Sequence, residues 1–213
     1  MKLDELLTVL PADDPGASPG LVVPDLEHGD LVSLFMQRLR AVDGTGHGPL
    51  PLRAAANSVL SIFSDAGVDS YLGWDDPGLP GIHGRLALVG IKRVDAWVPK
   101  EPARRLTHQS AYTDVGGGLT GADFGLAESG SIVLRSGPGR ARLASIVPAV
   151  HVAILPVGRV IRSLAHYAAE HPAAPTGLSN LVVVTGPSRT GDIEQQLNLG
   201  VHGPRHLHVV LVN

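Results

Sequence analysis

A short polar segment between two glycines, residues 186–191 with the sequence GPSRTG, carries side chains suited to binding an anion. It follows three consecutive valines, residues 182–184, which are typical of a strand buried on both faces. Ile193 and Leu197 follow it four residues apart, which is the spacing of one face of a helix. The pattern predicts a strand-to-helix turn whose unpaired backbone N–H groups point towards one anion.

Within this turn the predicted ligand-binding residues are Gly186, Ser188, Arg189 and Thr190. The hydroxyl groups and the guanidinium would bind a carboxylate or a phosphate. In the alternative interpretation, Ser188 or Thr190 caps the helix, and the acidic residues of its first turn complement the helix dipole. No external anion is then needed, and the sequence leaves both interpretations open.

A second candidate is Glu128 in the segment AESGS, where a carboxylate stands between an apolar strand and a glycine. This carboxylate could act as a general base or orient a ligand, and Ser129 and Gly130 of the same turn would contact that ligand. Asp123 lies five residues earlier, and two close carboxylates would create a proton acceptor near neutral pH. Alternatively, Glu128 accepts backbone N–H bonds that fix the turn, and Asp123 only forms a turn.

Two arginines, Arg140 and Arg142, follow the segment SGPG and share one face if the chain is extended. They either complete an anion site or pair with Asp123 and Glu128. His202, in the segment GVHGP, could transfer a proton or form a hydrogen bond with a substrate oxygen.

The last strand carries His206 and His208 on one face, and together with His202 they resemble part of a zinc site. No cysteine or carboxylate follows to complete that site. Isolated histidine spacing gives many false matches, so no bound metal is predicted.

Three glycine-bounded stretches occur in order: GADFGLAESGSIVL from Gly121, TGPSRTGDIE from Thr185 and GVHGP from Gly200. Together they resemble the LUD-domain proteins of the lactate utilisation protein C group, over about residues 115–213. The resemblance implies a fold of the type shared by ribose-5-phosphate isomerases, glucosamine-6-phosphate deaminases and coenzyme A transferases. It also implies a cytoplasmic protein required for oxidation of L-lactate to pyruvate, with lactate, pyruvate or a phosphate-bearing molecule as the small anionic ligand. The expected partners are proteins that carry iron–sulfur clusters.

The resemblance leaves other functions open, because the catalytic residues of the group are not assigned. Glu128 followed by Gly130 is similar to the turn that holds the nucleophilic glutamate of coenzyme A transferases, although Ala127 and Ser129 depart from that pattern. One alternative is therefore a stand-alone isomerase or acyl transferase that uses Glu128. Another is a non-catalytic scaffold whose motifs only stabilise turns.

Composition limits the classes of function for this chain. It has 213 residues and no cysteine, so it forms no disulfide and offers no thiolate to an iron–sulfur cluster, which must then lie on a partner. A formal charge of -3 and 4% aromatic residues argue against nucleic-acid binding. No apolar stretch approaches the length of about twenty residues that spans a bilayer. The first ten residues lack the features of a secretion signal, so the cytoplasm is expected.

Apolar periodicity predicts an alternation of helices and strands along the chain. The predicted helices are residues 31–42, 52–65, 160–170 and 192–199. The predicted strands are residues 70–72, 124–126, 131–134, 151–155, 181–185 and 207–212. The segment 82–89 fits either a helix or a strand, and 44–51 is predicted as a flexible loop with a solvated His47. The glycine-rich segment 116–121 permits a close backbone approach.

This alternation predicts a layered α/β domain with a largely parallel sheet and flanking helices. Residues 1–24 are predicted as an N-terminal helical arm and a linker, and residues 25–213 as a single α/β domain whose first part is helical. Ligands of such folds bind at the carboxyl ends of the strands. The sequence therefore predicts a pocket there, formed by Glu128, Ser188, Arg189, Thr190 and His202.

Overall fold

The central layer of the protein is a six-stranded sheet in which all neighbouring strands are parallel. The computed structural model describes residues 28–77, 79–94, 112, 114–170, 180–191, 197–199 and 203–213. The strand order is β1-β12-β7-β4-β2-β3. The strands are β1 (Thr45–Leu50), β2 (Ser70–Gly73), β3 (Lys92–Val94), β4 (Gly117–Gly121), β7 (Val150–Pro156) and β12 (His206–Val212). The prediction of an α/β fold with a largely parallel sheet is confirmed.

A second, mixed sheet of four strands has the order β8-β5-β6-β9. Strand β6 is antiparallel to both β5 and β9, whereas β5 and β8 are parallel. The strands are β5 (Phe124–Leu126), β6 (Ser131–Ser136), β8 (Val160–Ile161) and β9 (Asn180–Val184). The predicted strands at 124–126 and 131–134 are therefore confirmed as an antiparallel pair.

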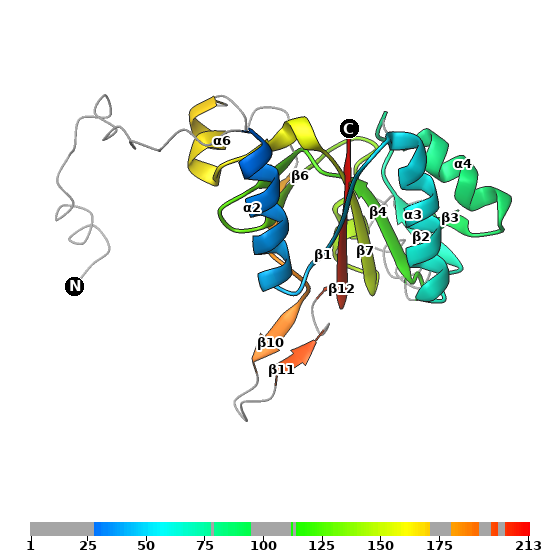
Figure 1. Cartoon of the computed structure of the whole chain (residues 1–213). Coiled ribbons are helices and arrows are strands. Elements are labelled where there is room, and N and C mark those ends of the chain that lie inside the picture. Colours follow the sequence, from blue (N-terminus) through cyan, green and yellow to red (C-terminus); the bar gives the residue numbers. More distant parts are fainter. Residues whose placement is uncertain are drawn as a thin grey trace.

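Helices cover the central sheet on both faces, with α3 and α4 on one side and α2 with the four-stranded sheet on the other (Figure 1). The helices are α2 (His28–Ala41), α3 (Leu52–Asp65), α4 (Pro80–Leu88) and α6 (Leu164–Glu170), with 3-10 turns η2 (Arg142–Ser145) and η3 (Val157–Arg159). Apolar spacing predicted α2 and α3 correctly, because each presents one apolar stripe. The stripe of α3 consists of Ala55, Val59, Ile62 and Phe63, all buried.

The core lies on both faces of the central sheet. Strands β7 and β12 lie inside the sheet, between other strands, and are buried along almost their whole length. This burial explains their runs of β-branched residues. Trp74, which follows β2, has one of the largest fully buried side chains. The segment after β2 is thus fixed by packing at the edge of the sheet where the strands end.

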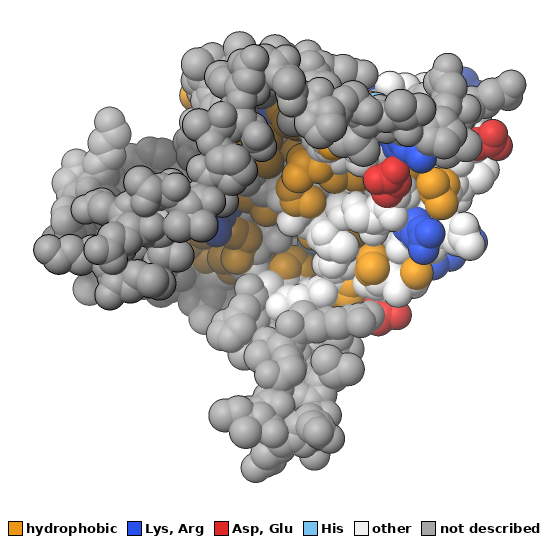
Figure 2. All heavy atoms as spheres, turned by 90° about the vertical axis from the view of Figure 1, so that its left-hand side faces the viewer, with side chains coloured by type: hydrophobic (Ala, Val, Ile, Leu, Met, Phe, Trp, Pro, Cys, Tyr) orange, Lys and Arg blue, Asp and Glu red, His pale blue; other side chains and the backbone are white. Residues whose placement is uncertain are grey.

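The face formed by α2, α6 and the four-stranded sheet carries exposed apolar side chains. Figure 2 shows hydrophobic side chains gathered in the middle of that face. Leu164 of α6 and Leu181 and Val183 of β9 are among the exposed large apolar residues. Strand β9 therefore buries only its inner face, and the prediction of burial on both faces for residues 182–184 is wrong.

Residues 45–50, predicted to lie within a flexible loop, form strand β1 instead. The segment contains two glycines and a proline, but it pairs in parallel with β12, with Thr45 opposite His208. His47 is half-buried rather than solvated, and its Nε2 lies 3.0 Å from Nδ1 of His208. Non-local pairing overrides the local turn propensity here.

Other boundaries differ from those predicted. The segment predicted at 82–89 is helical up to Leu88, where α4 ends, and the glycine-rich segment contains β4. The predicted helix 160–170 begins only at Leu164, because Val160 and Ile161 pair with β5 as strand β8.

The predicted helix 192–199 is wrong where the chain is described. Strands β10 (Arg189–Gly191) and β11 (Leu197–Leu199) form an antiparallel ribbon, with Arg189 opposite Leu199. Two apolar residues at helical spacing are weak evidence for a helix, and here the chain forms the β10–β11 pair instead. Residues 192–196 and the predicted N-terminal arm and linker, 1–24, lie outside the described residues.

Candidate functional site

The candidate site lies at the carboxyl ends of β2 and β4, where the order of the strands reverses. From β2 the chain continues to β3 at one edge of the sheet, whereas from β4 it continues towards β7 and the other edge. The two connections leave neighbouring strands in opposite directions, and ligands bind at such a switch point in folds of this kind. Gly73 and Gly121 end these two strands, so the residues that follow them lie at this switch point.

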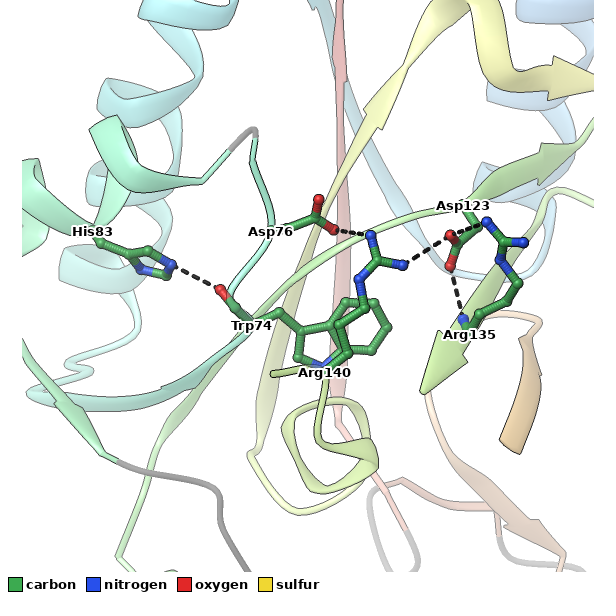
Figure 3. A network of polar contacts seen from close by, with 6 residues as sticks. All are labelled: Trp74, Asp76, His83, Asp123, Arg135 and Arg140. Carbon is green, nitrogen blue, oxygen red and sulfur yellow. Dashed lines mark hydrogen bonds and ion pairs between the residues drawn. The ribbon is translucent and has the colours of Figure 1, made fainter. Parts of the chain in front are cut away.

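The guanidinium of Arg140 lies between two carboxylates at this position (Figure 3). Its Nη2 is 3.0 Å from Oδ2 of Asp76, and its Nη1 is 3.0 Å from Oδ1 of Asp123. The Arg140 Cζ atom lies 5.3 Å from the centre of the Trp74 ring, a cation–π contact. The Arg140 side chain is 25% exposed, so a small molecule can reach it from solvent.

Asp123 holds the cluster from inside, with a side chain that is 1% exposed. Its Oδ2 accepts the backbone N–H of Arg135 at 2.8 Å, and its Oδ1 lies 3.0 Å from Nη2 of Arg135. One carboxylate thus orders two arginines. Because both of its oxygens are already used, Asp123 is a fixed acceptor rather than a mobile base.

Backbone bonds fix the segments that carry these side chains. The N–H of Trp74 donates to the carbonyl of Leu119, and its indole Nε1 donates to the carbonyl of Ala141 at 2.9 Å. A Cβ atom added at Gly121 would overlap the Asp76 carboxylate, so only glycine lets this side chain approach β4. The site is therefore preorganised by the fold.

A second layer of polar groups supports the same segment. Nε2 of His83 donates to the carbonyl of Trp74 at 3.0 Å, so the proton of the neutral ring lies on Nε2. The other ring nitrogen, Nδ1, therefore accepts from the Tyr71 hydroxyl at 2.9 Å. Burial lowers the pKa of His83, which keeps the ring neutral at pH 7. Arg93 donates to the Gly73 carbonyl and pairs with Asp75. These contacts position Trp74, whose ring lies beside the guanidinium of Arg140.

Among the described residues, the formal charges of the ion pairs around this switch point balance. Three aspartates, Asp75, Asp76 and Asp123, face three arginines, Arg93, Arg135 and Arg140. Such a site offers guanidinium N–H donors beside carboxylate acceptors. It matches a small molecule that has both a carboxylate and a hydroxyl group.

The structure brings together only part of the predicted site. Asp123 and Arg140 meet as an ion pair, the second of the two interpretations for Arg140. Glu128 lies beyond the other end of β5 from Asp123, with a half-exposed side chain that pairs with Arg162 at 2.8 Å. The predicted proton-sharing pair of Asp123 and Glu128 is therefore wrong. The predicted pairing of Arg140 with Glu128 is also not observed.

The turn after β5 has a packing role. Ser129 forms a hydrogen bond with Ser131 at 2.7 Å, and Ser131 bonds Thr185 at 2.7 Å, which ties the turn to the end of β9. Gly130 has a φ of 68°, and a Cβ atom there would overlap the backbone of Leu39 in α2. Gly130 therefore lets α2 pack directly on the turn.

Replacing Gly130 with alanine is expected to lower the free energy of unfolding by about 2 kcal/mol, because alanine is disfavoured at positive φ and displaces α2. Urea denaturation measures the change. Gly158→Ala is the control, because a Cβ atom there meets open space. Equal stability of the two variants would contradict the packing role of Gly130.

The residues of the GPSRTG segment lie away from the Arg140 site. A Cβ atom at Gly186, whose φ is 77°, would overlap the Val42 carbonyl. The N–H of Ser188 donates to the carbonyl of Pro204, just before β12 begins. This is the amino end of the sheet, and Arg189 and Thr190 are the first two residues of β10. The predicted strand-to-helix turn and the convergence of these residues with Glu128 at the carboxyl ends are wrong.

His202 lies outside the described residues, so its predicted role stays a prediction. Sequence reasoning missed Trp74, Asp76, His83 and Arg93. The available signal was the run GWDDPG directly after a predicted strand, where side chains face the carboxyl edge of a sheet.

Most of the chain is similar to proteins of one family. The family model described as LUD domain matches residues 33–212. The lactate utilization protein C of Halalkalibacterium halodurans is 34% identical over 157 residues, which are 72% of this chain and 65% of that protein. The protein of the same name from Shouchella clausii is 32% identical over 198 residues, 90% of this chain and 83% of that protein.

A solved structure shares the fold. The crystal structure of a DUF162 family protein from Deinococcus radiodurans matches with a TM-score of 0.66 and 18% sequence identity, covering 89% of this chain and all of that chain. In the part of the chain that the structure describes, no helix is long and apolar enough to cross a membrane.

Proposed function

Since this chain belongs to the LUD domain family, we propose that it serves in lactate utilisation and binds a small anionic ligand at the carboxyl ends of β2 and β4. The observation that carries the proposal is the guanidinium of Arg140, held between Asp76 and Asp123 and stacked on Trp74. A guanidinium has five N–H donors, and the two bonds to the aspartates use one on each terminal nitrogen. Donors remain for the carboxylate of a ligand.

The pattern of donors and acceptors favours a 2-hydroxy acid such as L-lactate. Its carboxylate would accept from Arg140, and its hydroxyl would donate to Asp76, whose side chain is 18% exposed. Pyruvate has the same carboxylate but no hydroxyl to donate. It would therefore use Arg140 without the bond to Asp76, and the two ligands can be distinguished by this residue.

Calorimetric titration of the purified chain with L-lactate and pyruvate tests the site. Arg140→Ala is expected to weaken binding of both ligands at least about tenfold, because a charge-assisted bond is lost. The control is Arg142→Ala, an exposed arginine two positions later, which should bind as the wild type does. Unfolding curves of each variant show that the fold persists. The site is wrong if Arg140→Ala and Arg142→Ala bind equally well.

Asp76→Asn separates the two ligands further. An amide is a weaker acceptor than a carboxylate, so lactate binding is expected to fall several-fold more than pyruvate binding. An equal loss for both ligands would contradict a hydroxyl contact to Asp76.

We further propose that this chain is the cluster-free member of a multi-protein lactate oxidation system. Oxidation of lactate to pyruvate removes two electrons and two protons, and a chain without cysteine has no thiolates for an iron–sulfur cluster to receive the electrons. The electrons would therefore pass to clusters on partner proteins. Lactate-dependent reduction of an electron acceptor should appear only when this chain and cluster-bearing partners are combined. Lactate oxidation by this chain alone, or by the partners alone, would contradict this division of roles between the chain and its partners.

A further inference from the structure

A polar cleft lies on the α3 side of the sheet, at the end opposite to the Arg140 site. It has a volume of about 470 Å³ and is bordered by the last turns of α3 and by the starts of β7 and β12. Its lining residues are His47, Ser58, Ser61, Ile62, Asp65, Ala66, Val150, His206 and His208. Among the residues that the structure describes, the lining contains three imidazoles and one carboxylate, and no lysine or arginine.

Two of these histidines, 161 positions apart in the chain, point ring nitrogens at each other. Nε2 of His47 on β1 lies 3.0 Å from Nδ1 of His208 on β12. The ring centres are 5.3 Å apart. His206 precedes His208 by two residues on the same strand, so both side chains emerge on the same face of the sheet.

Burial keeps the rings of His47 and His208 neutral at pH 7. Burial, followed by the neighbouring imidazoles of His47 and His206, lowers the pKa of His208 to about 4. Burial also lowers the pKa of His47. Neutral imidazole is the form that binds metal ions. The Asp65 carboxylate gives the cleft a negative charge, which favours a cation.

We infer that the cleft binds a late transition-metal ion such as Zn²⁺, with Nε2 of His47 and Nδ1 of His208 as ligands and His206 as the third. Two nitrogens bound to one tetrahedral zinc ion at 2.0–2.1 Å lie about 3.3 Å apart, so this pair needs to separate by only a few tenths of an ångström. The proton now shared between them would move to the outer nitrogen of the donating ring, the other ring already carries its proton on its outer nitrogen, and no proton would be released.

The third ligand requires one rearrangement. No three potential ligands among the described residues already surround one point. His206 is exposed, so its side chain can rotate towards the pair at small energetic cost, and water would complete the coordination. Imidazole ligands suit Zn²⁺, Cu²⁺ and Ni²⁺, whereas Mg²⁺ and Ca²⁺ prefer oxygen. The site should therefore distinguish these two groups of ions.

Calorimetric titration of the untagged, chelator-treated chain with ZnCl₂ tests the inference. One ion per chain is expected, with a Kd on the order of micromolar, and Mg²⁺ should give no signal. His47→Gln and His206→Ala should each weaken binding at least about tenfold. His166→Ala is the control, because the His166 ring on α6 forms a hydrogen bond with Ser163, just before that helix, and lies outside the lining of the cleft.

Thermal unfolding provides an independent readout. Zn²⁺ should raise the Tm of the wild type and of His166→Ala but not that of His47→Gln, because an ion that binds only the native state stabilises it. His206→Ala keeps the test decisive if His47→Gln fails to fold, since His206 is exposed. Absence of saturable Zn²⁺ binding, or unchanged binding in the folded variants of His47 and His206, would overturn the inference. Binding of L-lactate at Arg140 should not depend on the metal, so the two sites can fail separately.

Discussion

Replacing Asp123 with alanine is expected to lower the free energy of unfolding by about 3 kcal/mol. The carboxylate is buried and is shared by Arg135 and Arg140, and it also accepts the backbone N–H of Arg135. The substitution leaves two guanidiniums without their common partner and one N–H without its acceptor. Both arginines keep some contact with solvent, so the loss should lie at the lower end of the range for buried ion pairs. Chemical denaturation of the two proteins measures it.

A nearby ion pair supplies the control for this experiment. Asp75 pairs with Arg93 at 2.6 Å, but its side chain is 66% exposed. Asp75→Ala should therefore change stability by no more than about 1 kcal/mol, because solvent screens exposed pairs. If Asp123→Ala is no more destabilising than Asp75→Ala, the carboxylate does not hold the arginines in place. In that case the Arg140 site is not preorganised by Asp123.

Acidification should destabilise the protein through His151. This residue of β7 is fully buried, and its Nε2 forms a hydrogen bond with Oγ1 of Thr120 at 2.9 Å. Burial, followed by repulsion from His208 when that ring is also protonated, lowers the pKa of His151 from 6.5 to about 4. The unfolded chain therefore binds a proton at a higher pH than the folded protein does. The contribution of neutral His151 to the free energy of unfolding is complete above pH 6.5 and is lost as the pH falls towards 4. The loss expected from this residue is about 3 kcal/mol.

Unfolding free energies of the wild type and of His151→Gln at pH 7 and pH 4.5 test this expectation. Glutamine does not titrate, so the variant should lose less stability on acidification than the wild type, even if it is less stable at pH 7. His166→Gln, on the partly exposed face of α6, serves as the control and should follow the wild type. Identical pH dependence of the wild type and His151→Gln would show that His151 is not the acid-sensitive group.

Local sequence patterns determined several parts of this protein. Helices α2 and α3 follow from apolar residues at helical spacing, and β7 and β12 follow from short β-branched runs. These patterns report burial of one stripe or of a whole strand, and each is complete within a few residues. The three glycine-bounded motifs likewise identified the family, which the match over residues 33–212 confirms. Asp123 and Arg140 were also identified as candidates from their types and their positions beside strands.

Only the tertiary structure decided which strands are neighbours, and the sites depend on that choice. Strand β1 forms because β12 offers it a parallel partner, which brings His47 to His208. The placement of β2 beside β4 brings Asp76 to Arg140, although the two residues are 64 positions apart. The GPSRTG segment, in contrast, folds to the opposite end of the sheet from the Arg140 site. Pairing between distant strands depends on hydrogen bonds and burial that no short segment contains, so residue type and spacing could not predict these meetings.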